Sequence, residues 1–246
     1  MILIVVPCFN EEARWDSNYW NAMFQLPGVE WLFVDDGSTD ETSGILNDVL
    51  VNKTVTVLQL KKNKGKGEAV RAGLNKALSD GKPRIGVGFI DADGAFAASE
   101  VAKILASFEE LLKAQKCDAL WTSRVQLSGR NIHRSAKRHF AGRVLATIFS
   151  YGMASIPYDT QCGFKIFATS TQLQEVLKDR FQTRWLFELE LLNRWHVATG
   201  RQLAVWEEPL NSWKEIGQSK ITTREIRRVA FEVLRIKAIQ RQTKRK

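Results

Sequence analysis

Two acidic side chains that lie two residues apart are the first feature of this sequence that could do chemistry. Asp91 and Asp93 follow the apolar run RIGVGFI (residues 84–90) and precede Gly94. Carboxylates at the end of a buried strand lose solvation and repel one another, so they need a compensating cation. Mg²⁺ or Mn²⁺ would supply it, because both ions favour carboxylate and phosphate oxygens. An isolated Asp-x-Asp is more often a simple turn, but the buried strand before it favours a metal site that also holds phosphates.

A second acidic pair, Asp35 and Asp36, lies in the segment VDDGSTD (residues 34–40). One interpretation is local, with Ser38 or Asp40 capping the helix that follows. The other is that an aspartate accepts hydrogen bonds from the ribose or base of a nucleotide, as acidic residues do in the nucleotide crevices of α/β proteins. The segment by itself does not distinguish the two.

The segment NKGKGEAVRAG (residues 63–73) places two glycines, Lys64 and Lys66 directly before a predicted helix. The N-terminus of a helix with basic side chains nearby can bind an anion such as phosphate. The spacing differs from that of a Walker loop, so the signal is weak. A flexible loop with solvated lysines is the alternative.

These polar segments are positioned by a regular alternation of elements over residues 1–125. Apolar runs typical of strands alternate there with patterns typical of helices. The alternation predicts βαβ units, and therefore an α/β fold whose mostly parallel sheet is flanked by helices in one large domain. We expect strands at residues 2–7, 30–36, 54–60, 84–91 and 117–123, and helices at residues 12–26, 40–51, 67–81 and 97–116.

The polar segments all follow predicted strands. In open parallel sheets, ligands bind outside the carboxyl ends of the strands. Residues 7–12, 35–40 and 91–95 should therefore converge on one crevice, although they are far apart in the sequence.

Beyond residue 125 the pattern is less regular. The predicted helix at residues 134–152 is basic at its start and apolar later, and the last predicted helix has arginines opposite an apolar face. Both could lie on an anionic membrane, although core packing with a solvated outer face is the alternative. We expect strands at residues 163–168 and 201–209, a loop at residues 213–220, and further helices at residues 170–179, 186–198 and 222–240.

The positive charge is concentrated at the C-terminal end of the chain. The formal net charge of the 246 residues is +9, and residues 220–246, with ten basic and two acidic side chains, account for +8 of it. Such a stretch predicts an anionic partner surface. We expect a membrane face and no nucleic acid, because the charge is confined to this stretch and no aromatic–basic binding motif accompanies it.

The cysteines and the apolar runs bear on the compartment. The three cysteines are scattered and form no CxxC pair, which argues against a disulfide framework and indicates a reducing environment. The longest apolar run, residues 144–157, is too short to span a bilayer. We therefore expect a cytoplasmic protein that is peripheral on the inner face of the membrane.

Seven sequence segments that occur in a fixed order together indicate a protein family far more specifically than any one of them does. They are VVPCFNEE, VDDGSTD, NKGKGEAVRAG, DADGA, DTQCGFKIF, RWLFELELL and WKEIGQSK. Together they resemble the family-2 inverting glycosyltransferases of GT-A fold, and within these the polyprenyl- and dolichyl-phosphate sugar synthases, above all the dolichyl-phosphate β-glucosyltransferases. The resemblance implies a GT-A (Rossmann-like) domain at residues 1–220, with a nucleotide-sugar-binding half (1–125) and an acceptor-side half (126–220). A basic amphipathic helix at residues 221–246 would follow it.

The resemblance also implies roles for individual residues. Asp93 would be the direct ligand of Mg²⁺ or Mn²⁺, with Asp91 as a second ligand or nearer the ribose or sugar. The implied catalytic residues are Arg124 at a phosphate, Asp159 near the reacting centre, and Glu188 and Glu190 on the acceptor side. The implied nucleotide-sugar-binding residues are Pro7, Phe9, Glu11, Asp35, Asp36, Lys64, Lys66, Asp91, Ala92, Asp93 and Lys220.

Two of these residues have simpler interpretations. Glu190 could pair with Arg194 four residues further along a helix, which stabilises the helix without any catalytic role. Arg124 could belong to a surface ion pair.

The implied reaction moves a hexose, with UDP-glucose as the expected donor, to a polyprenyl or dolichyl phosphate. A lipid phosphate is already ionised near neutral pH, so it needs cations and no strong base. The candidates are Arg124 together with one of Arg134, Arg138 and Arg143. The alternative is a saccharide or other hydroxyl acceptor in cell-surface polysaccharide synthesis, for which Asp159 or Glu188 would take the proton. The expected partners are a UDP-hexose, a polyprenyl phosphate and an anionic membrane surface, and a homodimer is compatible with the sequence.

Overall fold

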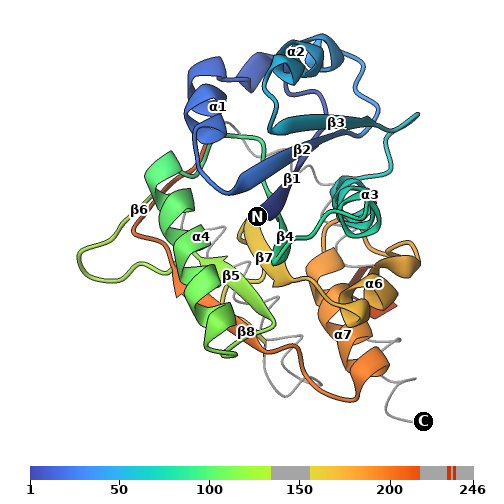
Figure 1. Ribbon diagram of the computed structural model, residues 1–246, viewed down its shortest axis with the longest axis vertical. Coiled ribbons are helices and arrows are strands. Elements are labelled where there is room, and N and C mark those ends of the chain that lie inside the picture. The colour runs from blue at the N-terminus through green and yellow to red at the C-terminus, as the bar shows by residue number, and fades with distance from the viewer. Residues whose placement is uncertain (134–155, 217–231, 234, 237–246) are drawn as a thin grey trace.

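The computed structural model describes residues 1–133, 156–216, 232–233 and 235–236. Within them the chain forms a seven-stranded sheet with the order β3-β2-β1-β4-β7-β5-β8 (Figure 1). A separate two-stranded parallel sheet joins β6 (Asn131–His133) to β9 (Ser212–Lys214). The strands of the large sheet are β1 (Ile2–Cys8), β2 (Val29–Asp35), β3 (Val55–Gln59), β4 (Gly86–Ile90), β5 (Ala119–Ser123), β7 (Phe164–Ala168) and β8 (Val205–Pro209).

The large sheet is mostly parallel, as the sequence predicted. β1 pairs in parallel with β2 and β4, β2 with β3, and β5 with β8. β7 is different, because it lies antiparallel between β4 and β5. The apolar run at residues 163–168 predicted a strand but not its direction, since direction depends on how the chain returns to the sheet.

Helices cover both faces of this sheet (Figure 1). Successive side chains of a strand point to opposite faces. In β1, Ile4 and Val6 therefore join one apolar cluster, and Leu3 and Val5 join the other. The first cluster includes side chains of α1 (Ser17–Phe24), α2 (Thr42–Asp48) and α4 (Ala98–Lys113), and the second those of α3 (Lys66–Ser79), α6 (Thr171–Lys178) and α7 (Phe187–Thr199).

Some predicted elements are shorter or interrupted. The helix expected at residues 12–26 is a 3₁₀ turn at Glu12–Arg14, followed by α1, whose start is capped by the Asp16 carboxylate accepting from the Tyr19 N–H at 3.0 Å. The second expected helix is α2 followed by a 3₁₀ turn at Val49–Val51. The loop expected from residue 213 was wrong at its start, because residues 213 and 214 belong to β9. A strand of three residues is too short to show a period of two.

Several expectations fall on residues that the structure does not describe. The predicted helix at residues 134–152 and most of the one at residues 222–240 lie outside the described ranges, although residues 232–233 and 235–236 are helical. Among the described residues, no helix is long and apolar enough to cross a membrane. The candidates Arg134, Arg138, Arg143 and Lys220 also lie outside the described residues.

Candidate active site

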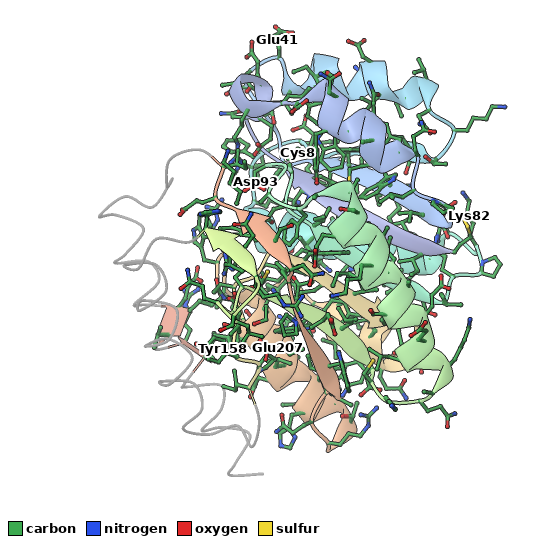
Figure 2. All side chains as sticks on the ribbon, turned by 90° about the vertical axis from the view of Figure 1, so that its left-hand side faces the viewer. Cys8, Glu41, Lys82, Asp93, Tyr158 and Glu207 are labelled. Atoms are coloured by element: carbon green, nitrogen blue, oxygen red, sulfur yellow. The ribbon has the colours of Figure 1, made fainter. Side chains whose placement is uncertain are left out.

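Polar loops meet at the carboxyl edge of the sheet, where the sequence placed them. They follow β1, β2 and β4, and β1 lies between the other two strands. The Asp36 N–H donates to the Cys8 carbonyl at 2.8 Å, and the Thr39 N–H donates to the side-chain oxygen of Asn10 at 2.9 Å. Figure 2 labels Cys8, the last residue of β1, and Asp93, which follows the neighbouring strand β4.

Asp91 forms an ion pair with Lys66, with 2.6 Å between Oδ1 and Nζ. Asp91 follows β4, and Lys66 is the first residue of α3. The Asp91 N–H donates to the Gly163 carbonyl at 3.0 Å, and a Cβ at position 163 would collide with the Asp91 carboxylate. A glycine before β7 therefore lets this carboxylate lie against the backbone. Burial alone would lower the pKa of Lys66, but the carboxylates of Asp91 and Glu188 raise it, so the ammonium stays charged.

Asp93 is the less compensated member of the acidic pair. Its Oδ1 accepts a hydrogen bond from the Ala95 N–H at 3.1 Å. Burial, and after it the neighbouring Asp91 carboxylate, raise the pKa of Asp93 to about 6. The folded chain by itself therefore does not fully stabilise the second negative charge, and a divalent cation would do so.

The donor atoms at this edge fit a hard divalent ion that shares its coordination with a substrate. In the part of the chain that the structure describes, no group of three or more His, Cys, Asp or Glu side chains could hold a metal ion. Asp91 and Asp93 would thus supply two carboxylates, and phosphates and water would complete the shell, as is usual for Mg²⁺. The raised pKa of Asp93 is the structural feature that such an ion would relieve.

The second acidic pair has partners in its own chain. The Asp36 carboxylate accepts hydrogen bonds from the backbone N–H groups of residues 64–65, at 2.8 and 2.6 Å. Asp35 accepts from the Ser38 N–H at 2.9 Å and from the Ser43 hydroxyl at 2.5 Å. Asp36 therefore shapes the glycine-rich loop before α3, and Asp35 shapes the turn before α2. Each carboxylate oxygen can accept a further hydrogen bond from a ligand.

The loop after β1 brings Glu11 and Arg14 to the same edge. Glu11 is buried and pairs with Arg14 at 2.5 Å, and its N–H donates to the Thr42 hydroxyl at 2.8 Å. Arg14 is one of the cations that partly offset the raised pKa of Asp93. Of the other predicted residues, Ala92 is buried in the loop after β4, Pro7 is partly exposed within β1, and Phe9 is partly exposed directly after β1.

Arg124, which follows β5, is held by Asp159. Its Nε and Nη2 donate to the two carboxylate oxygens at 2.7 and 2.8 Å, and its backbone N–H donates at 3.1 Å. Its guanidinium lies 5.1 Å from the centre of the Trp213 ring, and the Asp159 N–H donates to Glu207 at 2.7 Å. Arg124 and Asp159, two of the four predicted catalytic residues, are thus one oriented pair whose charges compensate each other.

A buried lysine that the sequence patterns did not single out lies in β7. Lys165 is fully buried, its Nζ donates to the Cys162 carbonyl at 2.5 Å, and Nζ lies 3.4 Å from Glu188 Oε1. The ammonium also lies 4.8 and 5.3 Å from the ring centres of Trp121 and Phe89. The sequence could have revealed Lys165, because it is a lysine within the apolar run GFKIFA. A buried strand position rarely carries a charge without a partner.

Glu188, in the first turn of α7, is the acidic partner of Lys165. Burial raises the pKa of Glu188, and the ammonium groups of Lys165 and Lys66 offset part of that rise. Its Oε2 has no hydrogen-bond partner among the described residues. Glu188, Asp91 and the two lysines therefore form one cluster of alternating charges that joins α3, β4, β7 and α7.

Glu190 has a different environment. Its carboxylate accepts hydrogen bonds from the backbone N–H groups of residues 182–183 and from the Thr183 hydroxyl at 2.9 Å. It also pairs with Arg194 at 2.7 Å, which is the simpler interpretation that the sequence left open. These contacts hold the segment before α7 against the helix, so the geometry gives Glu190 a structural role.

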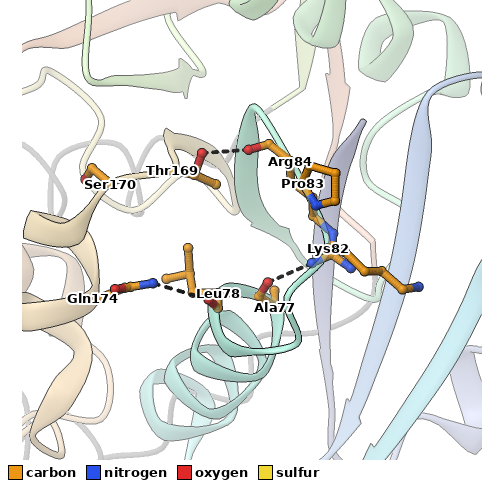
Figure 3. Close-up of a pocket in the computed structure, with 8 residues that line it drawn as sticks. All are labelled: Ala77, Leu78, Lys82, Pro83, Arg84, Thr169, Ser170 and Gln174. Carbon is orange, nitrogen blue, oxygen red and sulfur yellow. Dashed lines mark hydrogen bonds between the residues drawn. The ribbon is translucent and has the colours of Figure 1, made fainter.

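A cavity of about 290 Å³ lies at the opposite end of the sheet (Figure 3). It lies next to the amino end of β4, whereas Asp91 and Asp93 follow the carboxyl end. Its polar groups are paired, since the Thr169 hydroxyl donates to the Arg84 carbonyl and Gln174 donates to the Leu78 carbonyl. It is therefore separate from the candidate site. The residues that line it are Ala77, Leu78, Lys82, Pro83, Arg84, Thr169, Ser170 and Gln174.

Several curated proteins that are similar to this chain share the name dolichyl-phosphate beta-glucosyltransferase. Dolichyl-phosphate beta-glucosyltransferase ALG5C of Trichomonas vaginalis is 30% identical over 243 residues, which cover 94% of this chain and 69% of that protein. Dolichyl-phosphate beta-glucosyltransferase of Drosophila melanogaster is 31% identical over 237 residues, covering 89% of this chain and 68% of that protein. The Saccharomyces cerevisiae protein of the same name is 30% identical, with coverages of 89% and 68%.

Solved structures confirm the predicted GT-A fold. Glucosyl-3-phosphoglycerate synthase from Mycobacterium tuberculosis, in complex with Mn²⁺, UDP and phosphoglyceric acid, superposes with a TM-score of 0.66 at 18% identity, covering 98% of this chain and 78% of that one. TarS 1–349 of S. aureus, in complex with UDP-GlcNAc, gives a TM-score of 0.56 at 20% identity, covering 97% of this chain and 66% of that one. The family described as Glycosyl transferase family 2 matches residues 3–185. The chain therefore belongs to glycosyl transferase family 2 and is a glycosyltransferase.

Proposed function

We propose that this protein transfers glucose from UDP-glucose to a polyprenyl or dolichyl phosphate, with inversion at the anomeric carbon and with Mg²⁺ or Mn²⁺. The names of the similar curated proteins support the acceptor, and the complexes of the structural relative with UDP and Mn²⁺ support the donor and the metal. The observation that carries the proposal is the cluster of Asp91, Asp93 and Lys66 where β4 ends and α3 begins.

Asp91, Asp93 and Lys66 form the donor half of the proposed site. A bound divalent ion would neutralise the charge that develops on the leaving nucleoside diphosphate. Asp93 would hold this ion through its ionised carboxylate, while Lys66 and the backbone at Gly163 keep Asp91 in place. Lys66 is the first residue of α3, where the helix dipole favours a phosphate, and its ammonium adds a positive charge beside Asp91. Asp36 orients the backbone of this same loop.

The acceptor half of the site needs positive charge more than it needs a base. A lipid phosphate already carries an ionised oxygen that can attack the anomeric carbon. Arg124 can help to orient this phosphate, but its charge is already matched by Asp159. We therefore assign the attraction of the acceptor to Arg134, Arg138 and Arg143, which lie outside the described residues.

A hydroxyl acceptor is the alternative, and the environment of Glu188 is the observation that favours it. Burial raises the pKa of Glu188, and a carboxylate with a raised pKa is a better proton acceptor near neutral pH. The carboxylate of Asp159, the other candidate base, accepts hydrogen bonds from Arg124 at both oxygens. A hydroxyl acceptor would thus make Glu188 the general base.

The test compares acceptors with one donor. The purified chain is incubated with radiolabelled UDP-glucose and Mn²⁺, together with a short polyprenyl phosphate, with a saccharide, or with neither. We expect label in a lipid product, formed only with polyprenyl phosphate and lost when EDTA removes the metal. Transfer to the saccharide, with none to the lipid phosphate, would establish the alternative instead.

A further inference from the structure

A carboxylate from the C-terminal segment binds the start of α7. Glu232 is buried, and its Oε1 accepts a hydrogen bond from the Arg184 N–H at 2.8 Å. Its Oε2 accepts from the N–H groups of Trp185 and Leu186, both at 3.1 Å. Leu186 is the N-cap residue of α7, so the carboxylate lies where unpaired N–H groups and the helix dipole favour a negative charge.

Apolar and polar contacts hold the same turn of the C-terminal segment. Ile236 is fully buried in the cluster that α3, α6 and α7 share, and Val233 packs against this cluster. Arg235 donates to the Gln182 carbonyl at 3.2 Å. Glu232 is one of two acidic residues among ten basic ones in residues 220–246. An acidic residue in this basic stretch therefore lies where three backbone N–H groups just before α7 donate to it.

The backbone that this carboxylate holds continues directly into the donor site. The Arg184 carbonyl accepts a hydrogen bond from the Gly67 N–H at 3.3 Å. The Arg184 guanidinium donates to the Asn63 side chain and packs against Gly65, where a Cβ would collide with it. Lys66, the cation that pairs with Asp91, lies inside this loop.

We propose that Glu232 is a positioning residue for the donor site. By holding residues 184–186 it fixes Arg184, and through Arg184 it fixes residues 63–67, which carry Lys66. The inference rests on the proposed use of this loop to bind a nucleoside diphosphate. Because Glu232 acts on a loop that binds the donor in both the ground state and the transition state, its loss should change donor affinity more than the rate of the chemical step.

The test is the donor affinity of Glu232→Gln in the full chain. Glutamine keeps the size of the side chain, but its NH₂ group cannot accept a hydrogen bond from a backbone N–H. We expect the Kd for UDP with Mn²⁺, measured by titration calorimetry, to rise about tenfold, and kcat at saturating donor to stay within about twofold of wild type. Glu175→Gln is the matched control, because it removes the same charge from an α6 side chain that is 64% exposed, and it should leave the Kd unchanged.

A second variant, Arg184→Met, tests whether Glu232 acts on the donor loop through Arg184. If Glu232 acts through Arg184, the double variant loses less donor affinity than the two single losses combined. An unchanged Kd in Glu232→Gln, with only a lower melting temperature, would overturn the proposal, and so would fully additive losses. Should Glu232→Gln fail to fold, an unchanged Kd in Arg184→Met overturns it. A wild-type protein that binds no nucleotide would count against the proposed function instead, so the two failures are distinguishable.

Discussion

At the scale of single residues, the carboxylates of the candidate site differ in how well the chain compensates them. Asp91 has the Lys66 ammonium at 2.6 Å, and Asp159 has a two-point contact with Arg124. The pKa of Asp93, in contrast, is raised to about 6 by burial and by Asp91. A charge that the chain leaves partly uncompensated indicates a residue whose partner arrives with the substrate.

The Asp93→Asn variant tests the metal assignment through activity. The change keeps the shape of the side chain and removes the negative charge that would hold the cation. We expect kcat/KM to fall by about 100-fold or more, because metal stabilisation of a developing charge is worth several kcal/mol. Steady-state kinetics with UDP-glucose and Mn²⁺ measures this. Turnover like that of wild type would exclude Asp93 as a metal ligand.

The same variant should make the metal-free protein more stable at neutral and alkaline pH. The pKa of Asp93 rises from its ordinary value of 3.8 to about 6 on folding, so the ionised carboxylate destabilises the fold above pH 6. This penalty fades as the pH falls from about 6 to below the ordinary value of 3.8, where the carboxyl is protonated in both states. In EDTA, Asp93→Asn should melt roughly a few degrees higher than wild type at about pH 8, and by much less at about pH 4. An equal gain at both pH values would show that the charge is not the cause.

At the scale of the elements, α7 separates two acidic residues that look like a pair in the sequence. Residues two apart on a helix do not share a face. Glu188 meets Lys165 of β7, whereas Glu190 meets residues 182–183 and Arg194. One turn of helix thus contributes one carboxylate to the charge cluster of the site and another to the support of the segment before the helix.

Glu190→Gln should therefore affect stability and not chemistry. The variant removes a buried charge that accepts from two backbone N–H groups and from Arg194. We expect the free energy of unfolding to fall by roughly 2–3 kcal/mol, because buried donors and the guanidinium lose their acceptor. Urea denaturation measures the loss, and kcat/KM of the folded variant should stay near wild type. Lost activity at unchanged stability would place Glu190 at the substrate.

At the scale of the whole molecule, the C-terminal segment is both the most positively charged part of the chain and a part that packs against the core. Residues 220–246 carry almost the whole net charge of the chain, yet Glu232 and Ile236 within them are buried against α7 and the core. Glu232 and Ile236 thus tie this part of the chain to the fold, and the basic residues of the same segment predict an anionic partner surface. We propose that this surface is the inner face of a membrane, where a polyprenyl phosphate would be found.

Neutralising the basic residues at the end of the chain tests this proposal. Each lysine or arginine near an anionic membrane contributes about 1 kcal/mol of binding. Replacing five of them by glutamine should lower binding to phosphatidylserine vesicles by at least about tenfold in a sedimentation assay, while the Kd for UDP stays unchanged. Vesicles of phosphatidylcholine alone are the control. Equal binding by the variant and wild type would remove this segment from the membrane contact. The five residues are Lys237, Arg241, Lys244, Arg245 and Lys246.

Most of the fold could be predicted because it depends on local patterns. The apolar runs before Pro7, Asp36 and Asp91 mark buried parallel strands, and the polar residues after them mark the carboxyl edge. The direction of β7 and the pairing of β6 with β9 could not be predicted, because both depend on which distant segments meet. The interrupted helix at residues 12–26 shows the same limit at short range, since a capping contact at Asp16 overrides the periodicity.

By itself, the sequence determined which residues lie at the carboxyl edge, because strand, turn and helix signals are properties of neighbouring residues. Only the tertiary structure decided which charges meet there. Lys66 pairs with Asp91, Arg124 with Asp159, and the buried Lys165 with Glu188, each across a separation that no local pattern spans. Glu232 binds the backbone of Arg184 across 48 residues, and thereby reaches the loop of Lys66. These contacts follow from the strand order and from the antiparallel β7, which place distant segments within the few ångströms over which charges and hydrogen bonds act.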